Sequence, residues 1–161
     1  MIEIGGLPAH ILLIHAVLIF ALLAGVGAVV FAFWRRSRKY LAWPLGVLSV
    51  ILVPLAVITA EAGEQLEHAL GASEAVRIHA AQGSAFRVVV FIFFLVVVAQ
   101  ILAAFPSVLQ RWDALRGIQR VLEIRWVGPV TSVLGVAAGA FLIYDTILTG
   151  HSGASAVWLG R

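Results

Sequence analysis

Long stretches of the chain are almost purely apolar all the way around a helix, and this pattern decides which elements we expect. Four such runs stand out, and none alternates between apolar and polar residues as an outer-membrane strand does. A helix needs about 20 mostly apolar residues to cross a bilayer. We therefore expect four membrane-spanning helices, at about 8–34, 41–69, 74–105 and 128–149.

Local signals mark several ends of these helices. Pro8 stands near the first turn of the first helix, and Pro106 stops the third. The second run continues as a polar helical stretch, 61–70, before Gly71. Ser73 is suited to cap the third helix, with Glu74 in its first turn.

The segment 107–125, between the third and fourth runs, has a different pattern. Its apolar residues recur at spacings of three and four, with arginines between them. This pattern predicts a basic amphipathic helix that lies on the membrane surface. In the fourth run, Gly135 and Gly139 form a GxxxG pattern, which we expect to serve close packing inside the bundle rather than a dimer contact.

Composition narrows the class of protein. Of the 161 residues, 62% are hydrophobic and only 12% are charged, which excludes a soluble globular monomer. The length suits a single domain, 1–161, and the expected fold is an all-α integral membrane four-helix bundle with an additional interfacial helix. The absence of cysteine excludes disulfides, thiolate ligands and covalently attached c-type haem.

The basic residues predict the orientation. Eight of the eleven Lys and Arg residues fall in two loops, 35–39 and 107–126, at the ends of apolar runs. That placement is typical of membrane topology and not of nucleic-acid binding. We expect both loops in the cytoplasm, both termini outside, and a location in the plasma membrane of a bacterium.

Polar residues gather toward the opposite surface. Counting about 20 residues outward from each cytoplasmic boundary sets a common outer level on the four helices. The residues near or beyond this level are His10, His15, Glu61, Glu64, His68, His79, Gln82, Arg87, Asp145 and His151.

These side chains suggest a cofactor site. Neutral imidazole binds many metals and is the axial ligand of b-type haem, which two histidines on facing helices can hold. His10 and His15 lie about 140° apart on a regular helix, so both cannot face the bundle. We expect His15 and His79 to ligate haem b, with His10 and His68 as alternates.

Two other interpretations remain open. Glu64 could complete a non-haem site for zinc, copper or iron with His10, His15 and His79. Alternatively, these residues occupy the interface, bond to one another and bind no cofactor. Asp145 either pairs with Arg87 or belongs to the site, and the membership of His151 is equally open.

Three segments carry a resemblance to a known family. The segment GLPAHILLIHAVLIF contains His10 and His15, PLAVITAEAGEQLEH contains Glu64, and EAVRIHAAQG contains His79. They resemble the actinobacterial branch of an uncharacterised bacterial family of four-helix membrane proteins, the domain of unknown function 2231. The family's first helix opens with an HPxLVH motif, from which this chain departs at Ile11. The resemblance covers about the first two thirds of the chain.

The resemblance implies a redox role. Relatives are sometimes joined to Rieske or cytochrome c-like domains, and the family is similar in outline to four-helix b-type cytochromes. We therefore expect an electron carrier or redox anchor rather than an enzyme, with at most one haem because no histidine lies toward the cytoplasm. The alternatives are a metal-handling protein or enzyme and a cofactor-free accessory subunit. Expected partners are the bilayer and a redox protein or larger membrane complex; the oligomeric state stays open.

Overall fold

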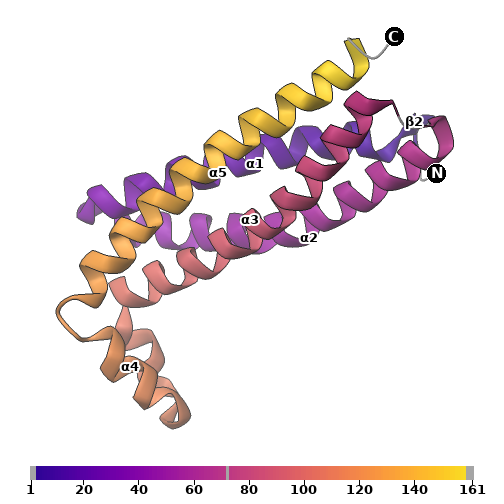
Figure 1. Cartoon of the computed structure of the whole chain (residues 1–161). Helices are drawn as coiled ribbons and strands as arrows, with labels where there is room; N and C mark the ends of the chain where they lie inside the picture. The colour runs from indigo at the N-terminus through magenta and orange to yellow at the C-terminus, as the bar shows by residue number, and fades with distance from the viewer. Residues whose placement is uncertain (1–2, 72, 159–161) are drawn as a thin grey trace.

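The computed structural model describes residues 3–71 and 73–158; residue 72 and the two chain ends, 1–2 and 159–161, lie outside that part. The expected all-helical fold is confirmed. Four long helices, each long and apolar enough to cross a membrane, make up most of the chain (Figure 1). They are α1 (Ala9–Phe33), α2 (Arg38–Leu70), α3 (Glu74–Ala104) and α5 (Val127–Trp158). Before α1, a two-residue antiparallel pair joins β1 (Glu3–Ile4) to β2 (Leu7–Pro8).

The ends of α2 and α3 follow the local signals in the sequence. The polar stretch after residue 60 continues α2, as expected, and the helix ends at Gly71, whose φ of 85° suits glycine. The Ser73 side chain caps α3 by accepting a hydrogen bond of 3.3 Å from the backbone N–H of Val76. By contrast, α5 continues to Trp158, about two and a half turns beyond the expected end at 149.

The connection between α3 and α5 differs from the expected single amphipathic helix at 107–125. It consists of two 3₁₀ helices, η2 (Pro106–Arg111) and η3 (Asp113–Leu115), followed by the short helix α4 (Arg116–Leu122). The break falls at Trp112, whose extended backbone (φ −122°, ψ 107°) separates the first two segments. Figure 1 shows this connection projecting from one end of the four long helices.

The long helices pack in a closed order. α5 contacts α1 and α3, and α2 contacts the same two helices from their other side. α1 and α5 approach closely at two glycines: a Cβ atom added to Gly139 would lie 2.7 Å from the carbonyl oxygen of Gly25. Gly135 packs against the side chain of Gln100 on α3. The expectation that the GxxxG pattern serves packing within the bundle is therefore confirmed.

The inside and outside of the bundle have unusual compositions. Besides alanines and a few large apolar side chains, the interior contains polar groups: Ser49, Thr59, Gln100, Thr131, Asp145, Thr146, Thr149 and Ser152. Large apolar side chains cover the outer faces of all four long helices, for example Leu23, Ile58, Phe91 and Phe141. A soluble protein rarely exposes so continuous an apolar surface.

A candidate two-histidine site

His10 and His79 come together at the end of the bundle where α1 and α3 begin. The centroids of their imidazole rings lie 6.0 Å apart, and the ring planes are inclined by 72°. Both side chains are half-buried. The structure thus pairs the expected His79 with His10, which was one of the alternates, and not with His15.

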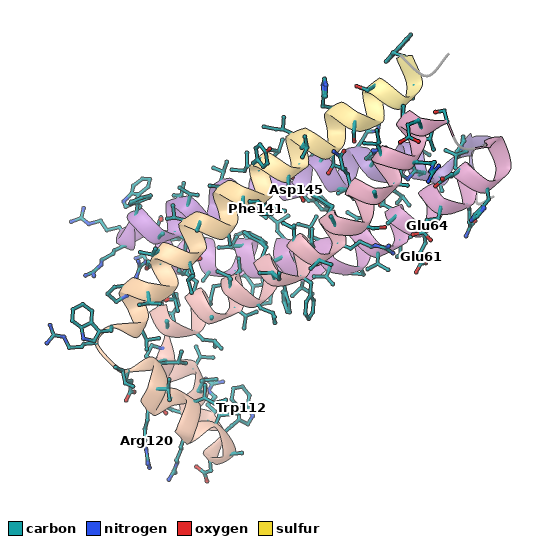
Figure 2. All side chains as sticks on the ribbon, in the orientation of Figure 1. Glu61, Glu64, Trp112, Arg120, Phe141 and Asp145 are labelled. Atoms are coloured by element: carbon teal, nitrogen blue, oxygen red, sulfur yellow. The ribbon has the colours of Figure 1, made fainter. Side chains whose placement is uncertain are left out.

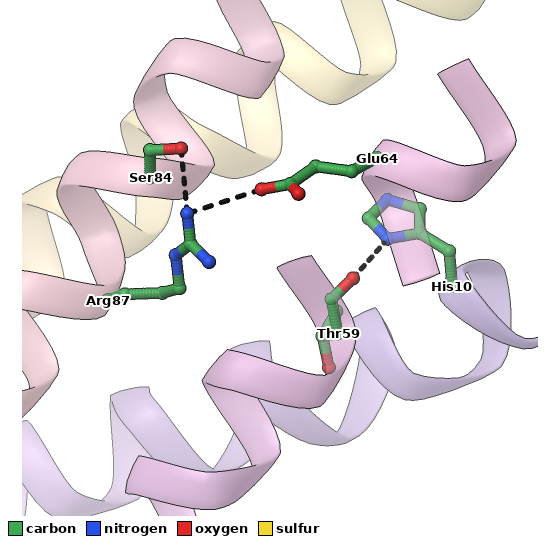
Figure 3. A network of polar contacts seen from close by, with 5 residues as sticks. All are labelled: His10, Thr59, Glu64, Ser84 and Arg87. Carbon is green, nitrogen blue, oxygen red and sulfur yellow. Dashed lines mark hydrogen bonds and ion pairs between the residues drawn. The ribbon is translucent and has the colours of Figure 1, made fainter. Parts of the chain in front are cut away.

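His10 is held by α2. Its Nδ1 lies 2.8 Å from the backbone carbonyl oxygen of Thr59 (Figure 3). A carbonyl oxygen only accepts hydrogen bonds, so Nδ1 of His10 carries the proton and donates it. In the neutral ring, Nε2 therefore keeps its lone pair.

His79 is held in the same way by α5. Its Nδ1 lies 3.0 Å from Oγ of Ser152, and that hydroxyl donates its own proton to the carbonyl oxygen of Thr149 at 2.9 Å. While the hydroxyl donates to Thr149, its oxygen can accept from Nδ1–H of His79. In that arrangement the neutral His79 ring presents an unprotonated Nε2.

Glycines make room for both rings. A Cβ atom added to Gly63 on α2 would lie 2.9 Å from Nδ1 of His10, and one added to Gly153 on α5 would lie 3.0 Å from Cε1 of His79. Any larger residue at either position would displace an imidazole. Each histidine therefore sits in a cradle formed by a neighbouring helix.

The other histidines lie outside this pair. His15 is exposed and its Nδ1 bonds to the carbonyl oxygen of Ile11, 2.7 Å away in the same helix. His68 and His151 are exposed on α2 and α5. The expected pairing of His15 with His79 has no counterpart among these contacts.

Glu64 points toward α3 rather than toward the histidines. Its Oε1 lies 3.3 Å from Nη2 of Arg87, which also donates to Oγ of Ser84 at 3.0 Å (Figure 3). This ion pair joins α2 to α3. The described residues contain no group of three or more His, Asp or Glu side chains arranged to hold a metal ion, so the set His10, His15, Glu64 and His79 is not assembled.

Asp145 is not paired with Arg87. It lies in the middle part of α5 (Figure 2) and is only 8% exposed, and its Oδ2 has no hydrogen-bond partner in the described part of the chain. Thr149 Oγ1, one turn further along α5, and Gln82 Oε1, one turn beyond His79 on α3, are also buried without a partner. Glu61, in contrast, is exposed on α2.

The residues that position the histidines were missed in the sequence. Thr59 contributes only a backbone carbonyl, which no side-chain pattern reveals. Ser152 and Gly153 did carry a signal: small residues on the polar extension of α5 leave space for a large ring from another helix.

Comparisons with protein-family models, with curated proteins and with solved structures find no match to this chain. The resemblance to the domain of unknown function 2231 stays a prediction.

Proposed function

We propose that this chain is a multi-pass membrane protein that holds one b-type haem between His10 and His79 and serves electron transfer. The observation that carries the proposal is the close pair of imidazoles on two different helices, each fixed through its own Nδ1. Histidines that ligate metals nearly always donate this second N–H to a carbonyl or another acceptor, which fixes the tautomer and makes Nε2 a better ligand.

The distance between the rings supports a shared metal ion. An imidazole nitrogen lies about 2 Å from a bound metal, so two ligating rings would have centroids about 6 Å apart. The observed separation of 6.0 Å agrees with this value.

The number of donors favours haem over a bare ion. Zinc sites take three or four protein ligands, whereas haem iron takes axial ligands from the protein and its remaining ligands from the porphyrin. Two histidines without a third His, Asp or Glu among the described residues suit the second case. A bound haem would supply an iron centre that carries one electron.

Membrane insertion is supported by the surface of the bundle. Four helices are long and apolar enough to span a bilayer, and their outer faces carry large apolar side chains. Polar side chains are turned inward, as expected where lipid replaces water around the bundle.

The distribution of charge and aromatic rings supports the orientation in a bacterial plasma membrane. Arginine and lysine concentrate at the turn between α1 and α2 and in the α3–α5 connection, which we place in the cytoplasm. Exposed Trp34, Trp43, Trp112 and Trp126 accompany them, as in the aromatic belt of an interface. The chain termini would then lie outside the cell.

A single site near one surface limits the electron-transfer role. All five histidines belong to the end of the bundle where α1 begins, so the chain alone holds no second pair for transfer across the bilayer. We propose that it exchanges electrons with a redox protein, or within a larger membrane complex, on the outer side.

An absorption spectrum tests this function. The protein would be purified in mild detergent, oxidised in air and then reduced with dithionite, and its iron, zinc and copper would be measured. A haem spectrum with about one iron per chain supports the proposal. Absence of a haem band from the purified protein rejects it. Bound metal without haem would favour the non-haem alternative. Absence of both haem and metal would favour a cofactor-free subunit.

A further inference from the structure

A cavity of about 630 Å³ opens at the other end of the bundle, where α1 turns into α2. Four basic residues line it: Arg35, Arg36, Arg38 and Lys39. Its apolar wall is formed by Ala104 and Phe105 at the end of α3. None of the described residues that line the cavity is acidic.

One of the four cations already has a structural role. Arg38 donates from Nε to the carbonyl oxygen of Phe31 and from Nη2 to that of Ala32, both at 2.9 Å. These bonds satisfy carbonyl groups in the last turn of α1, and a longer contact of 3.4 Å reaches Oγ of Ser132 on α5. Arg38 therefore holds the cavity in shape.

The remaining cations are available to a ligand. Arg35, Arg36 and Lys39 are exposed, and the three ion pairs of the described residues all lie elsewhere. Lys39 makes a cation–π contact with the adjacent Tyr40, whose ring centroid is 4.8 Å from Nζ. α2 begins in the same place, and the Ser37 hydroxyl does not cap it but donates to the carbonyl oxygen of Trp34. The positive end of the α2 dipole thus adds to the basic side chains.

We infer that this cavity binds the headgroup of an anionic phospholipid in the cytoplasmic leaflet. Phosphate suits a cluster of basic groups, because two of its oxygens can accept parallel hydrogen bonds from one guanidinium and its charge attracts the others. This inference rests on the membrane insertion proposed above but not on the histidine site.

The surroundings favour a lipid over free phosphate. Tyr40 lines the cavity and is strongly exposed. Close to it in the chain, exposed aromatic rings of the kind that meet lipid headgroups occur at Phe33, Trp34 and Trp43. Ala104 and Phe105 would contact the glycerol and upper acyl region, which inorganic phosphate lacks. Basic pockets between membrane helices on this side commonly bind such headgroups.

The test compares lipids and two matched double variants. Purified protein in neutral detergent would be titrated with phosphatidylglycerol, phosphatidylcholine or inorganic phosphate, with bound lipid measured by native mass spectrometry. Arg35→Gln/Arg36→Gln removes two cavity charges, while Arg120→Gln/Arg125→Gln removes two exposed charges from the α3–α5 connection. Arg38 is left intact because it caps α1.

We expect phosphatidylglycerol to bind with a much higher affinity than phosphatidylcholine. The cavity variant should weaken this binding about thirtyfold, since it removes two contacts to the headgroup and each is worth about a factor of five. The control should change it less than threefold, because Arg120 and Arg125 do not line the cavity. Equal binding of the two lipids, or equal losses in both variants, would overturn the inference. So would phosphate binding as tightly as the lipid, because the ligand would then be a soluble anion.

Flotation of the same protein with vesicles separates this outcome from failure of the proposed function. Protein that does not float is not inserted, which refutes the membrane proposal itself. If the protein floats but contains no haem, the proposed haem site is wrong, and the lipid titration still tests the basic cavity.

Discussion

The imidazole rings of His10 and His79 meet edge to face with their centroids 6.0 Å apart, although the two residues belong to the first and third long helices of the chain. Neither ring is oriented by its own helix. The backbone carbonyl of Thr59 on α2 bonds to Nδ1 of His10, and the hydroxyl of Ser152 on α5 bonds to Nδ1 of His79. The geometry of the pair therefore depends on all four long helices, and single substitutions can test each part of it.

Replacing the two histidines one at a time should abolish haem binding. Loss of an outer partner of a ligand already costs about 10- to 100-fold in metal affinity, so loss of the ligand itself should cost more. We expect purified His10→Ala and His79→Ala to contain less than a tenth of the wild-type haem, measured by the reduced-minus-oxidised spectrum.

His15→Ala decides between the two pairings of the histidines. It should retain its haem, because His15 is exposed and bonds within its own helix. Loss of haem in His15→Ala with retention in His10→Ala would restore the pairing expected from the sequence. His151→Ala, another exposed histidine, is the matched control.

Removing the acceptor of the His79 proton should weaken the site without destroying it. Ser152→Ala leaves Nδ1–H of His79 without its partner at 3.0 Å, so the ring can rotate or change tautomer. We expect the affinity for added haemin to fall about 10- to 100-fold, followed by absorbance titration. Ser155→Ala, one turn further on α5, should bind as wild type; an equal loss there would show a general effect of α5.

Much of the fold follows from local properties of the sequence. The four long helices were predicted because each apolar run exceeds the thickness of a bilayer, and the start of α3 because Ser73 is a good cap. The connection at 107–125 was mispredicted as one helix because the spacing of its apolar residues does not reveal the extended backbone of Trp112. The spacing of apolar residues shows which face of a helix is apolar, but it does not show whether the helix is continuous.

The site was predicted only in part for a related reason. Counting residues along each helix placed His10, His15 and His79 near the same level, but which side chains meet depends on rotation about the helix axis and on tertiary contacts. His10 is turned inward by a carbonyl 49 residues away, at Thr59, and His15 bonds to its own helix instead. Glu64 was expected near the histidines, yet Arg87 offers it an opposite charge at 3.3 Å.

The buried carboxyl group of Asp145 should lower the stability of the bundle. Its Oδ2 is buried without a partner, and a buried charge without a compensating partner is strongly destabilising. We expect Asp145→Asn, which removes the charge and keeps the shape, to raise the free energy of unfolding in detergent by about 1 kcal/mol or more, measured by chemical denaturation.

The control for Asp145→Asn is the same change at an exposed carboxylate. Glu61→Gln on α2 should change the stability by less than about 0.5 kcal/mol. If Asp145→Asn lowered the stability while Glu61→Gln did not, the carboxyl group of Asp145 would have a binding partner, such as an ion or a proton donor, that stabilises the native protein.

The close approach of α1 and α5 should be sensitive to any added side chain. A Cβ atom at Gly139 would lie 2.7 Å from the carbonyl oxygen of Gly25, well inside the contact distance. We expect Gly139→Leu to lower the free energy of unfolding by about 1–3 kcal/mol or more, as overpacking does elsewhere. Gly128→Leu, in the same helix but with no atom within 4 Å of the added Cβ, should be tolerated. Equal losses of stability in the two variants would show that the effect does not come from the contact between α1 and α5.

The orientation in the membrane can be measured directly because the chain contains no cysteine. A single introduced thiol is then the only target for a maleimide that does not cross membranes. Ala114→Cys probes the α3–α5 connection, and Ala154→Cys probes the end of α5; both positions are exposed, and both replace the same residue. Since basic loops stay in the cytoplasm, intact bacterial cells should be labelled at position 154 and not at position 114.

After permeabilisation both positions should react, which controls for accessibility. The reverse pattern in intact cells would place the two histidines on the cytoplasmic side, and the proposed redox partner would then be sought there. Labelling of both positions would argue against four complete spans.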